Sequence, residues 1–254
     1  MLVDSHAHLQ WRSFDRDREK VISRAREADV KYIVNIGYDL EGSKKALELC
    51  EKHEGLFAAV GIHPHEASEF NEKVLDSLRG LCDNPKVVAI GEIGLDYYRN
   101  VSPKGVQQKA FEAQMILANE LRLPVVIHDR DAHADTLKTL SKFNGETKGV
   151  MHCFSGSPEM AEQCIKMDYY VSFAGPVTFP NAHGVHKTAK SIDLNRILIE
   201  TDCPWLAPQE MRGKRNEPAF LPITAAKIAN LRSISLEELA EVTTRNAKQI
   251  FKLP

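Results

Sequence analysis

Eight short apolar runs, each followed by a stretch with helical character, constrain the fold of this chain more than any other feature of its sequence. The runs lie at residues 2–3, 32–36, 57–60, 87–90, 125–127, 149–151, 169–173 and 197–199. Most of them lack alternation between polar and apolar residues, which is typical of parallel strands that are covered on both faces. Their alternation with helical stretches predicts a chain of βα units.

Capping residues indicate where some of the helices between these runs begin and end. Ser102 and Ser157 each precede a proline, so each combines an N-cap with proline at the first helical position. Ser235 and Glu238 form a capping box that begins the last helix. Pro124 disfavours helical conformation in the residue before it, so the helix that begins near residue 103 should end just before this proline.

Eight parallel strands fit either an open, doubly wound sheet or a closed (β/α)8 barrel. No glycine-rich GxGxxG or GxxxxGK[ST] loop follows any of the runs, which argues against the common nucleotide-binding versions of the open sheet. A chain of 254 residues has a length that is usual for one barrel domain. We therefore expect residues 1–254 to form a single α/β domain, a TIM barrel, with the functional residues at the carboxyl ends of its strands.

The composition excludes several classes of protein. With 43% hydrophobic and 27% charged residues, the sequence is that of an ordinary globular protein and not of a disordered one. The net charge of −2 argues against a broadly basic protein that coats nucleic acid, but it permits a nuclease whose metal ions supply local positive charge. The five cysteines form no CxxC pair, and we find no signal peptide or membrane-spanning run. We expect a cytoplasmic protein with reduced thiols, no membrane contact and no obligate protein partner.

Histidines and carboxylates follow the apolar runs directly, at the ends where a barrel places its active site. This group comprises His6, His8, His63, His65, Glu92, His128, His152, Glu200 and Asp202. His6 and His8 are two residues apart, as are Glu200 and Asp202, so each pair points to one side of an extended strand. These donor types suit Zn²⁺, Mn²⁺ or Fe²⁺, and also Mg²⁺ if oxygen ligands and water complete the shell.

Six of these groups are more than one catalytic metal ion normally uses. A bridging carboxylate would seat two cations about 3.5 to 4 Å apart, and Glu92 lies midway in the order of the strands. Our hypothesis is a centre with two divalent ions, which are Mg²⁺, Mn²⁺ or Zn²⁺. The expected ligands are His6, His8, Glu92 and Asp202 for the first ion, and Glu92, His128 and His152 for the second.

The strand-end motifs resemble those of the TatD-like metal-dependent deoxyribonucleases of the amidohydrolase superfamily. The matching segments, in chain order, are DSHAHL (4–9), GIHPH (61–65), GEIGLDYY (91–98), VIH (126–128), HCFSG (152–156), ETDCPW (200–205) and RGKRNEP (212–218). The resemblance implies a TIM barrel with a binuclear metal centre on the same six residues. It also implies hydrolysis of DNA phosphodiester bonds by an exonuclease that acts from the 3′ end, in DNA repair or degradation. The implied substrate is single-stranded DNA or a 3′ end.

Phosphodiester hydrolysis needs an activated water and support for the charge that develops on the phosphate. Metal coordination lowers the pKa of water from about 15.7 towards about 7, which provides metal-bound hydroxide at neutral pH. We expect Asp202 to orient this water and accept its proton, beside Glu92 as the bridging carboxylate; a plain ligand is the alternative for Asp202. His63 is expected to donate a hydrogen bond to the phosphate. Glu200 is expected to orient a ligand or a substrate group.

A basic segment after the last run suggests where the nucleic-acid backbone binds. Arg212, Lys214 and Arg215 place three cations within four residues, and Asn216 adds hydrogen-bonding capacity. A solvated loop is the alternative for such a cluster of charges. Four aromatic residues in or near barrel-mouth loops are candidates for stacking on unpaired bases or for packing in the core: Tyr97, Tyr98, Phe179 and Trp205.

Two other functions compete with the nuclease. The first is a binuclear amidohydrolase that acts on a small cyclic amide, lactone or phosphoester, although Glu92 stands where such relatives often carry a carboxylated lysine. The second is a metal-dependent binding protein without turnover. A complete ligand set beside Asp202 argues against it, because structural metal sites are usually closed. The residues alone also leave open endonuclease or exonuclease action, and DNA or RNA as the substrate.

Overall fold

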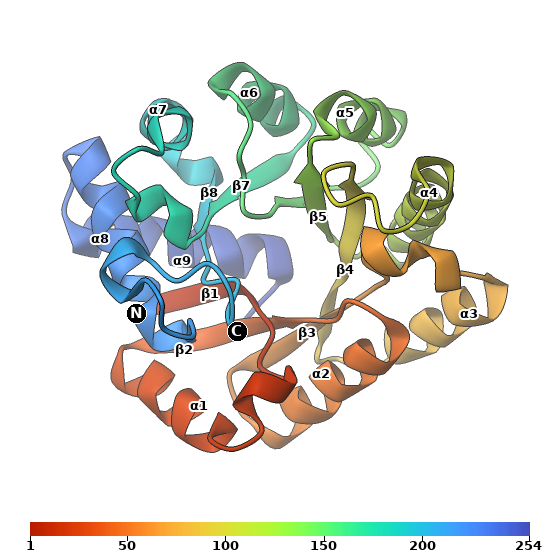
Figure 1. The fold of residues 1–254 in the computed structure, drawn as a ribbon, viewed down its shortest axis with the longest axis horizontal. Coiled ribbons are helices and arrows are strands. Elements are labelled where there is room, and N and C mark those ends of the chain that lie inside the picture. Colours follow the sequence, from red (N-terminus) through yellow and green to blue (C-terminus); the bar gives the residue numbers. More distant parts are fainter.

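Eight strands form one parallel sheet in the computed structural model, which describes residues 1–254 (Figure 1). In chain order they are β1 (Leu2–Ala7), β2 (Val30–Ile36), β3 (Leu56–Val60), β4 (Val87–Asp96), β5 (Val125–Arg130), β6 (Gly149–Met151), β7 (Tyr169–Phe173) and β8 (Ile197–Ile199). Each strand pairs in parallel with the next one along the chain. The eight runs predicted as strands are confirmed, and so is their parallel pairing.

The sheet closes because the segment after β8 pairs with the end of β1. Ala7 and Cys203 form a parallel bridge, and the N–H of His8 donates to the carbonyl of Cys203 over 2.9 Å. The N–H of Asp202 donates to the carbonyl of His6, also over 2.9 Å. Eight parallel strands in sequential order with this closing contact form a TIM barrel, as the sequence predicts.

Nine α-helices surround the barrel or cover one end of it (Figure 1). They are α1 (Arg18–Glu27), α2 (Leu40–Lys52), α3 (Glu72–Leu81), α4 (Lys104–Leu121), α5 (His133–Lys142), α6 (Pro158–Lys166), α7 (His183–Ser191), α8 (Leu221–Arg232) and α9 (Leu236–Phe251). A short 3-10 helix, η1 (Arg12–Phe14), lies between β1 and α1. No helix combines the length and the apolar character that crossing a lipid bilayer requires.

The barrel interior is closed at its amino end by the C-terminal helix. A cluster of 14 buried apolar residues contains at least one residue from every strand, together with Ile250 and Phe251 of α9. The amide of Asn246 donates to the carbonyl of Ile197 at the start of β8, and the hydroxyl of Thr244 donates to the carbonyl of Met1. Apolar packing and these hydrogen bonds fix α9 below the strands, so only the carboxyl end of the barrel is available for a polar site.

The capping predictions are confirmed at two of three positions. The hydroxyls of Ser157 and Ser235 each accept a hydrogen bond from the backbone N–H three residues later, at the starts of α6 and α9. The expected cap at Ser102 is wrong, because α4 begins at Lys104 without a side-chain cap. The hydroxyl of Ser102 donates instead to the carbonyl of His65 over 2.8 Å, which ties the loop after β3 to the loop after β4.

Candidate metal centre

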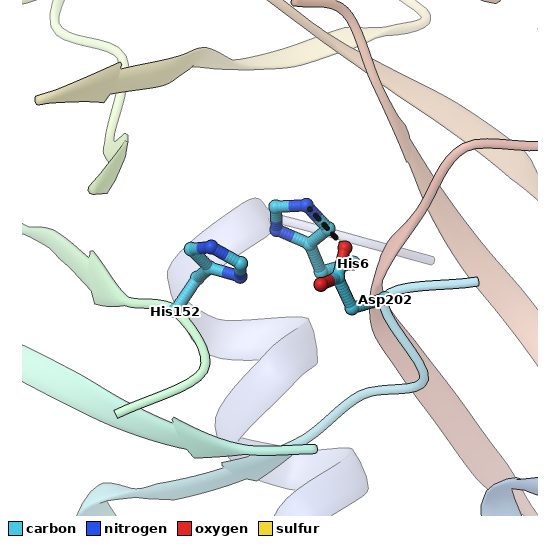
Figure 2. A group of neighbouring side chains, drawn as sticks. All are labelled: His6, His152 and Asp202. Carbon is cyan, nitrogen blue, oxygen red and sulfur yellow. Dashed lines mark ion pairs between the residues drawn. The ribbon is translucent and has the colours of Figure 1, made fainter. Parts of the chain in front are cut away.

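The six predicted ligands lie together at the carboxyl ends of the strands, although they come from five separate segments of the chain. They are His6 in β1, His8 just after it, Glu92 in β4, His128 in β5, His152 after β6 and Asp202 after β8. Figure 2 shows three of them, His6, His152 and Asp202, with side chains that converge from three segments. The rings of His6 and His152 stack with their centroids 4.0 Å apart. The barrel therefore gathers residues from opposite ends of the sequence into one cluster.

Donor atoms of this cluster are spaced as metal ligands would be, and two sets of three lie close enough together to hold an ion: His6, His8 and Glu92, and His6, His152 and Asp202. The Nε2 of His6 lies 3.0 Å from the Nε2 of His8, 3.4 Å from Oε2 of Glu92 and 3.6 Å from Oδ1 of Asp202. The Nε2 of His8 lies 3.7 Å and 3.5 Å from the same two oxygens. Ligands about 2.0–2.1 Å from a tetrahedral metal lie roughly 3.3 Å from one another, so this donor set fits a divalent cation.

The other carboxylate oxygen of Glu92 faces a second group of imidazoles. Oε1 lies 2.8 Å from Nδ1 of His128, 3.0 Å from Nε2 of His152 and 3.6 Å from Nε2 of His63. His63, Glu92 and His128 offer ligand atoms that lie close enough together to hold an ion. Glu92 thus presents one oxygen to each group, which is the geometry of a bridging carboxylate. His63 was not among the ligands predicted from the sequence.

Hydrogen bonds behind the cluster set which ring nitrogen faces it. The Nδ1 of His8 lies 2.8 Å from the carbonyl oxygen of Ile36, which can only accept, so Nδ1 carries the hydrogen and Nε2 presents its lone pair. His152 donates from Nδ1 to Oε1 of Glu200 over 3.0 Å, and its Nε2 faces Glu92. Carbonyls and carboxylates commonly orient metal-binding histidines in this way.

The ionisation states of the cluster suit metal binding. Burial would raise the pKa of Glu92, but the facing histidines, led by His152, hold it well below its usual value. Burial also opposes ionisation of Asp202, and a hydrogen bond from His8 and the charge of His6 still lower its pKa. Burial lowers the pKa of His6, which favours the neutral imidazole. Burial opposes protonation of His152 and His128, but the carboxylates that face them raise the pKa of both rings, so these two imidazoles release their protons when a cation binds.

Asp96, at the end of β4, is a site residue that the sequence analysis missed. Its Oδ2 accepts from Nε2 of His128 over 3.1 Å and from Nε2 of His65 over 2.9 Å. Its Oδ1 accepts from the backbone N–H of Arg99 over 2.8 Å. Asp96 thereby fixes the orientation of the His128 ring. Its spacing of four residues from Glu92, which puts both on one side of a strand, was the signal available in the sequence.

Glu200 is completely buried beneath the cluster. Its Oε1 accepts from the His152 ring over 3.0 Å and from the backbone N–H of Cys153 over 2.7 Å. Of the two roles considered for Glu200, orienting a ligand matches these contacts. Direct contact with substrate does not, because the side chain has no exposed surface.

The basic segment after β8 faces away from the cluster. Arg215 pairs with both carboxylate oxygens of Asp17, at 2.9 and 2.7 Å. Asn216 is fully buried and donates to the carbonyls of Thr201 and Trp205, over 2.8 and 2.7 Å. The phosphate contacts expected of Arg215 and Asn216 are therefore not supported, because their donors already anchor this loop. Arg212 and Lys214 are exposed, but neither lines the cavity above the metal centre.

That cavity has a volume of about 620 Å³ and a lining of two chemical kinds. Histidines and carboxylates of the cluster line it together with apolar residues such as Phe173, Val177 and Leu206. Two cations, Arg99 and Arg130, also line the cavity. Arg99 follows β4 and Arg130 ends β5, and neither was predicted from the sequence. Trp205, predicted near the mouth, lines the cavity with 43% of its surface exposed.

Known proteins with similar sequences and structures have a related chemistry. The family model described as TatD related DNase matches residues 3–252. The metal-dependent hydrolase YabD of Bacillus subtilis (strain 168) is 45% identical over 254 residues, with both chains covered completely. A protein of Erwinia tasmaniensis named 3′-5′ ssDNA/RNA exonuclease TatD is 38% identical over 259 residues, covering 99% of this chain and 100% of that one.

A solved structure extends this likeness to three dimensions. The crystal structure of YJJV, a TatD homologue from Escherichia coli K12, has a TM-score of 0.94 and 30% sequence identity. The match covers 100% of this chain and 98% of that one. The likeness therefore includes the barrel and the segments that carry the histidine and carboxylate cluster. The chain belongs to the TatD-related DNase family and is a metal-dependent hydrolase.

Proposed function

We propose that this protein is a deoxyribonuclease that removes nucleotides one at a time from the 3′ end of single-stranded DNA. The observation that carries the proposal is the placement of Glu92, whose two oxygens face two separate groups of imidazoles beside an open cavity. Two adjacent cations suit in-line displacement at a phosphodiester. The name of the Erwinia relative, 3′-5′ ssDNA/RNA exonuclease, supports the direction of attack and the single-stranded substrate.

The donor groups divide between two divalent ions in this proposal. The first set is His6, His8, Glu92 and Asp202, and the second is Glu92, His128 and His152. Ligand atoms lie close enough to hold an ion in His6, His8 and Glu92, in His63, Glu92 and His128, and in His6, His152 and Asp202, so His152 is also within reach of the first ion and His63 is a further donor for the second. When bound, the ions lower the pKa of a coordinated water and neutralise charge on the phosphate. The donors are compatible with Zn²⁺ and Mn²⁺, and with Mg²⁺ where water fills the remaining positions.

Side chains around the cavity supply the other steps. Asp202 accepts the proton of the attacking water, because its lowered pKa keeps it ionised and it is more exposed to the cavity than Glu92, at 14% against 6%. His63 donates a hydrogen bond to the phosphate when it is not occupied as a ligand. Arg99 and Arg130 attract the phosphate, and the apolar residues of the cavity pack against the terminal base and sugar.

The decisive experiment incubates metal-reconstituted protein with single-stranded DNA labelled at its 5′ end, with and without a chelator. We expect a ladder that shortens from the 3′ end, no cleavage with the chelator, and none with a His128→Ala variant. Matched RNA and duplex DNA of the same sequence measure the preference for single-stranded DNA. The proposal fails if no nucleic acid is cleaved, and turnover of a lactone or cyclic amide by the same preparation would identify an amidohydrolase instead.

A further inference from the structure

A second cavity, of about 700 Å³, lies beside the metal centre on the outside of the barrel. It is lined by Arg12 from the segment between β1 and α1, by Arg18 at the start of α1, and by Lys45 and Lys52 of α2. We call it the α2 groove. α1 and α2, between which it lies, follow β1 and β2 in the outer ring (Figure 1).

The α2 groove and the metal-centre cavity share two aromatic residues, Trp11 and Tyr38. Their ring centroids are 5.0 Å apart, and Trp11 also contacts the ring of Trp205 at 5.1 Å. Trp205 in turn lies 5.2 Å from the ring of His8 at the metal centre. A continuous series of aromatic side chains therefore leads from the metal centre into the groove, and aromatic rings are the surfaces on which unpaired bases stack.

The groove is locally positive in a protein whose net charge is −2. It has four basic residues and two acidic ones, Asp15 and Glu48, and Asp15 is neutralised by an ion pair with Arg18 at 2.6 Å. Lys45 makes only a loose pair with Glu41, at 3.4 Å. Arg12 and Lys52 are exposed and have no ion-pair partner. Exposed cations that nothing neutralises are available to phosphate groups.

The spacing of the two lysines fits an extended strand. Lys45 and Lys52 are seven residues apart in one helix, so they lie on the same face and about 10 Å apart along its axis. The pair therefore spans a distance suited to two different phosphates of one backbone.

We infer that the α2 groove binds the part of a single-stranded nucleic acid that lies on the 5′ side of the nucleotide being cleaved. The inference rests on the proposed function and extends it from the reacting 3′ end to the rest of the strand. The terminal nucleotide occupies the metal-centre cavity, the next bases stack at Trp11 and Tyr38, and the following phosphates lie against Lys45 and Lys52. Longer substrates consequently bind more tightly than a dinucleotide does.

The test compares thymidine oligonucleotides of two and eight nucleotides, with phosphorothioate linkages to slow hydrolysis and a fluorophore at the 5′ end. Fluorescence anisotropy measures their Kd values on metal-loaded protein. The Lys45→Glu/Lys52→Glu variant should bind the octamer at least about tenfold more weakly than the wild type. The loss of two phosphate contacts should also lower the slope of log Kd against log salt by about 1.4.

A Lys44→Glu/Lys73→Glu variant is the matched control, because it makes the same change in charge at two exposed lysines outside both cavities. It should bind the octamer as the wild type does. Equal losses of octamer affinity in both variants, or equal affinity of the wild type for dimer and octamer, would show that the α2 groove does not bind the strand. Cleavage from the 3′ end by the wild type would then still support the proposed function. A wild type that neither binds nor cleaves any oligonucleotide would overturn both proposals.

Discussion

At the residue scale, three histidines of the centre have their outer ring nitrogen already engaged, whereas Nδ1 of His6 has no partner. His8 and His152 each donate one ring N–H to a carbonyl or carboxylate, which directs the remaining nitrogen to the cluster. Asp96 accepts a hydrogen bond from Nε2 of His128, which directs the other nitrogen of that ring to the cluster. Little rearrangement is then needed when an ion binds, and the supporting residues influence metal affinity without touching the metal.

Asp202 combines two roles that a conservative substitution can separate. We expect an Asp202→Asn variant to retain its metal content, since the amide oxygen still ligates, and to lose at least about 100-fold in kcat because it cannot accept the proton of water. The measurement is kcat on single-stranded DNA together with metal content by atomic emission. Full turnover with normal metal content would show that Asp202 is a ligand only.

Asp96 provides a test of the support behind the metal ligands. An Asp96→Asn variant loses the charged acceptor that orients His128, so metal affinity should fall about 10- to 100-fold, as measured by competition with a chromogenic chelator. A His65→Gln variant is the control, because it leaves the bond between Asp96 and His128 in place. Its affinity should change less than about threefold. An equal loss of metal affinity in the two variants would mean that the effect comes from the loop that carries His65 and not from the orientation of His128.

The sequence predicted the convergence of six residues of the site but not its surroundings. Their positions after apolar runs were sufficient, because the carboxyl ends of all barrel strands meet at one end. The proximity of His63 to Glu92 and the support from Asp96 depend on side-chain directions that spacing alone does not set. The ion pair of Arg215 was not predictable, because its partner, Asp17, is remote in the chain and becomes its neighbour only in the folded barrel.

At the scale of elements, the sequence identified each strand but underestimated the length of several, β1 and β4 among them, as it did that of β5, which runs on to Arg130 and carries His128. β1 and β4 continue beyond their apolar residues, β1 to Ala7 and β4 to Asp96, because the polar residues that follow remain in the sheet. These polar extensions carry His6 and Glu92 into the metal centre. The prediction failed there because a strand that carries functional residues lacks the apolar pattern by which strands are recognised.

An ion pair at the start of α5 gives stability a dependence on pH. Nδ1 of His133 lies 2.7 Å from Oδ2 of Asp129, and the hydrogen bond that it donates to this carboxylate raises the pKa of His133 above 6.5. A histidine with a raised pKa in the folded state contributes its stability in full below the unfolded pKa of about 6.5 and loses it as pH rises through the folded value. The pair therefore stabilises the protein in mildly acidic and not in basic solution.

A His133→Gln variant tests this dependence. The wild type should exceed the variant in free energy of unfolding by less than about 1 kcal/mol at pH 6, since 43% of the His133 side chain is exposed and solvent screens the pair. The difference should vanish by about pH 9. Urea unfolding at both pH values measures it, and a difference that grows with pH would contradict the assignment.

At the scale of the whole molecule, closure of the barrel and assembly of the metal centre depend on the same junction. Asp4 of β1 is fully buried, and its Oδ1 accepts from the backbone N–H groups of His6 and Thr201 over 3.2 and 3.0 Å. Its Oδ2 accepts from the hydroxyl of Thr201 over 2.6 Å. The junction joins the two ends of the sheet directly beside His6 and Asp202, so a weaker junction reduces global stability.

Removing the Thr201 hydroxyl leaves a buried carboxylate oxygen without a partner. We expect a Thr201→Val variant to lose about 2 kcal/mol in free energy of unfolding, the typical cost of deleting a hydrogen bond to a charged group. A Thr201→Ser variant keeps the hydroxyl and should lose less than about 1 kcal/mol. Urea unfolding at pH 8 in metal-free buffer is the appropriate measurement, because burial raises the pKa of Asp4 to about 7 and most of this carboxyl is ionised there. A larger loss in Thr201→Ser than in Thr201→Val would mean that the methyl packing of Thr201, and not its hydrogen bond across the closing strands, stabilises the barrel.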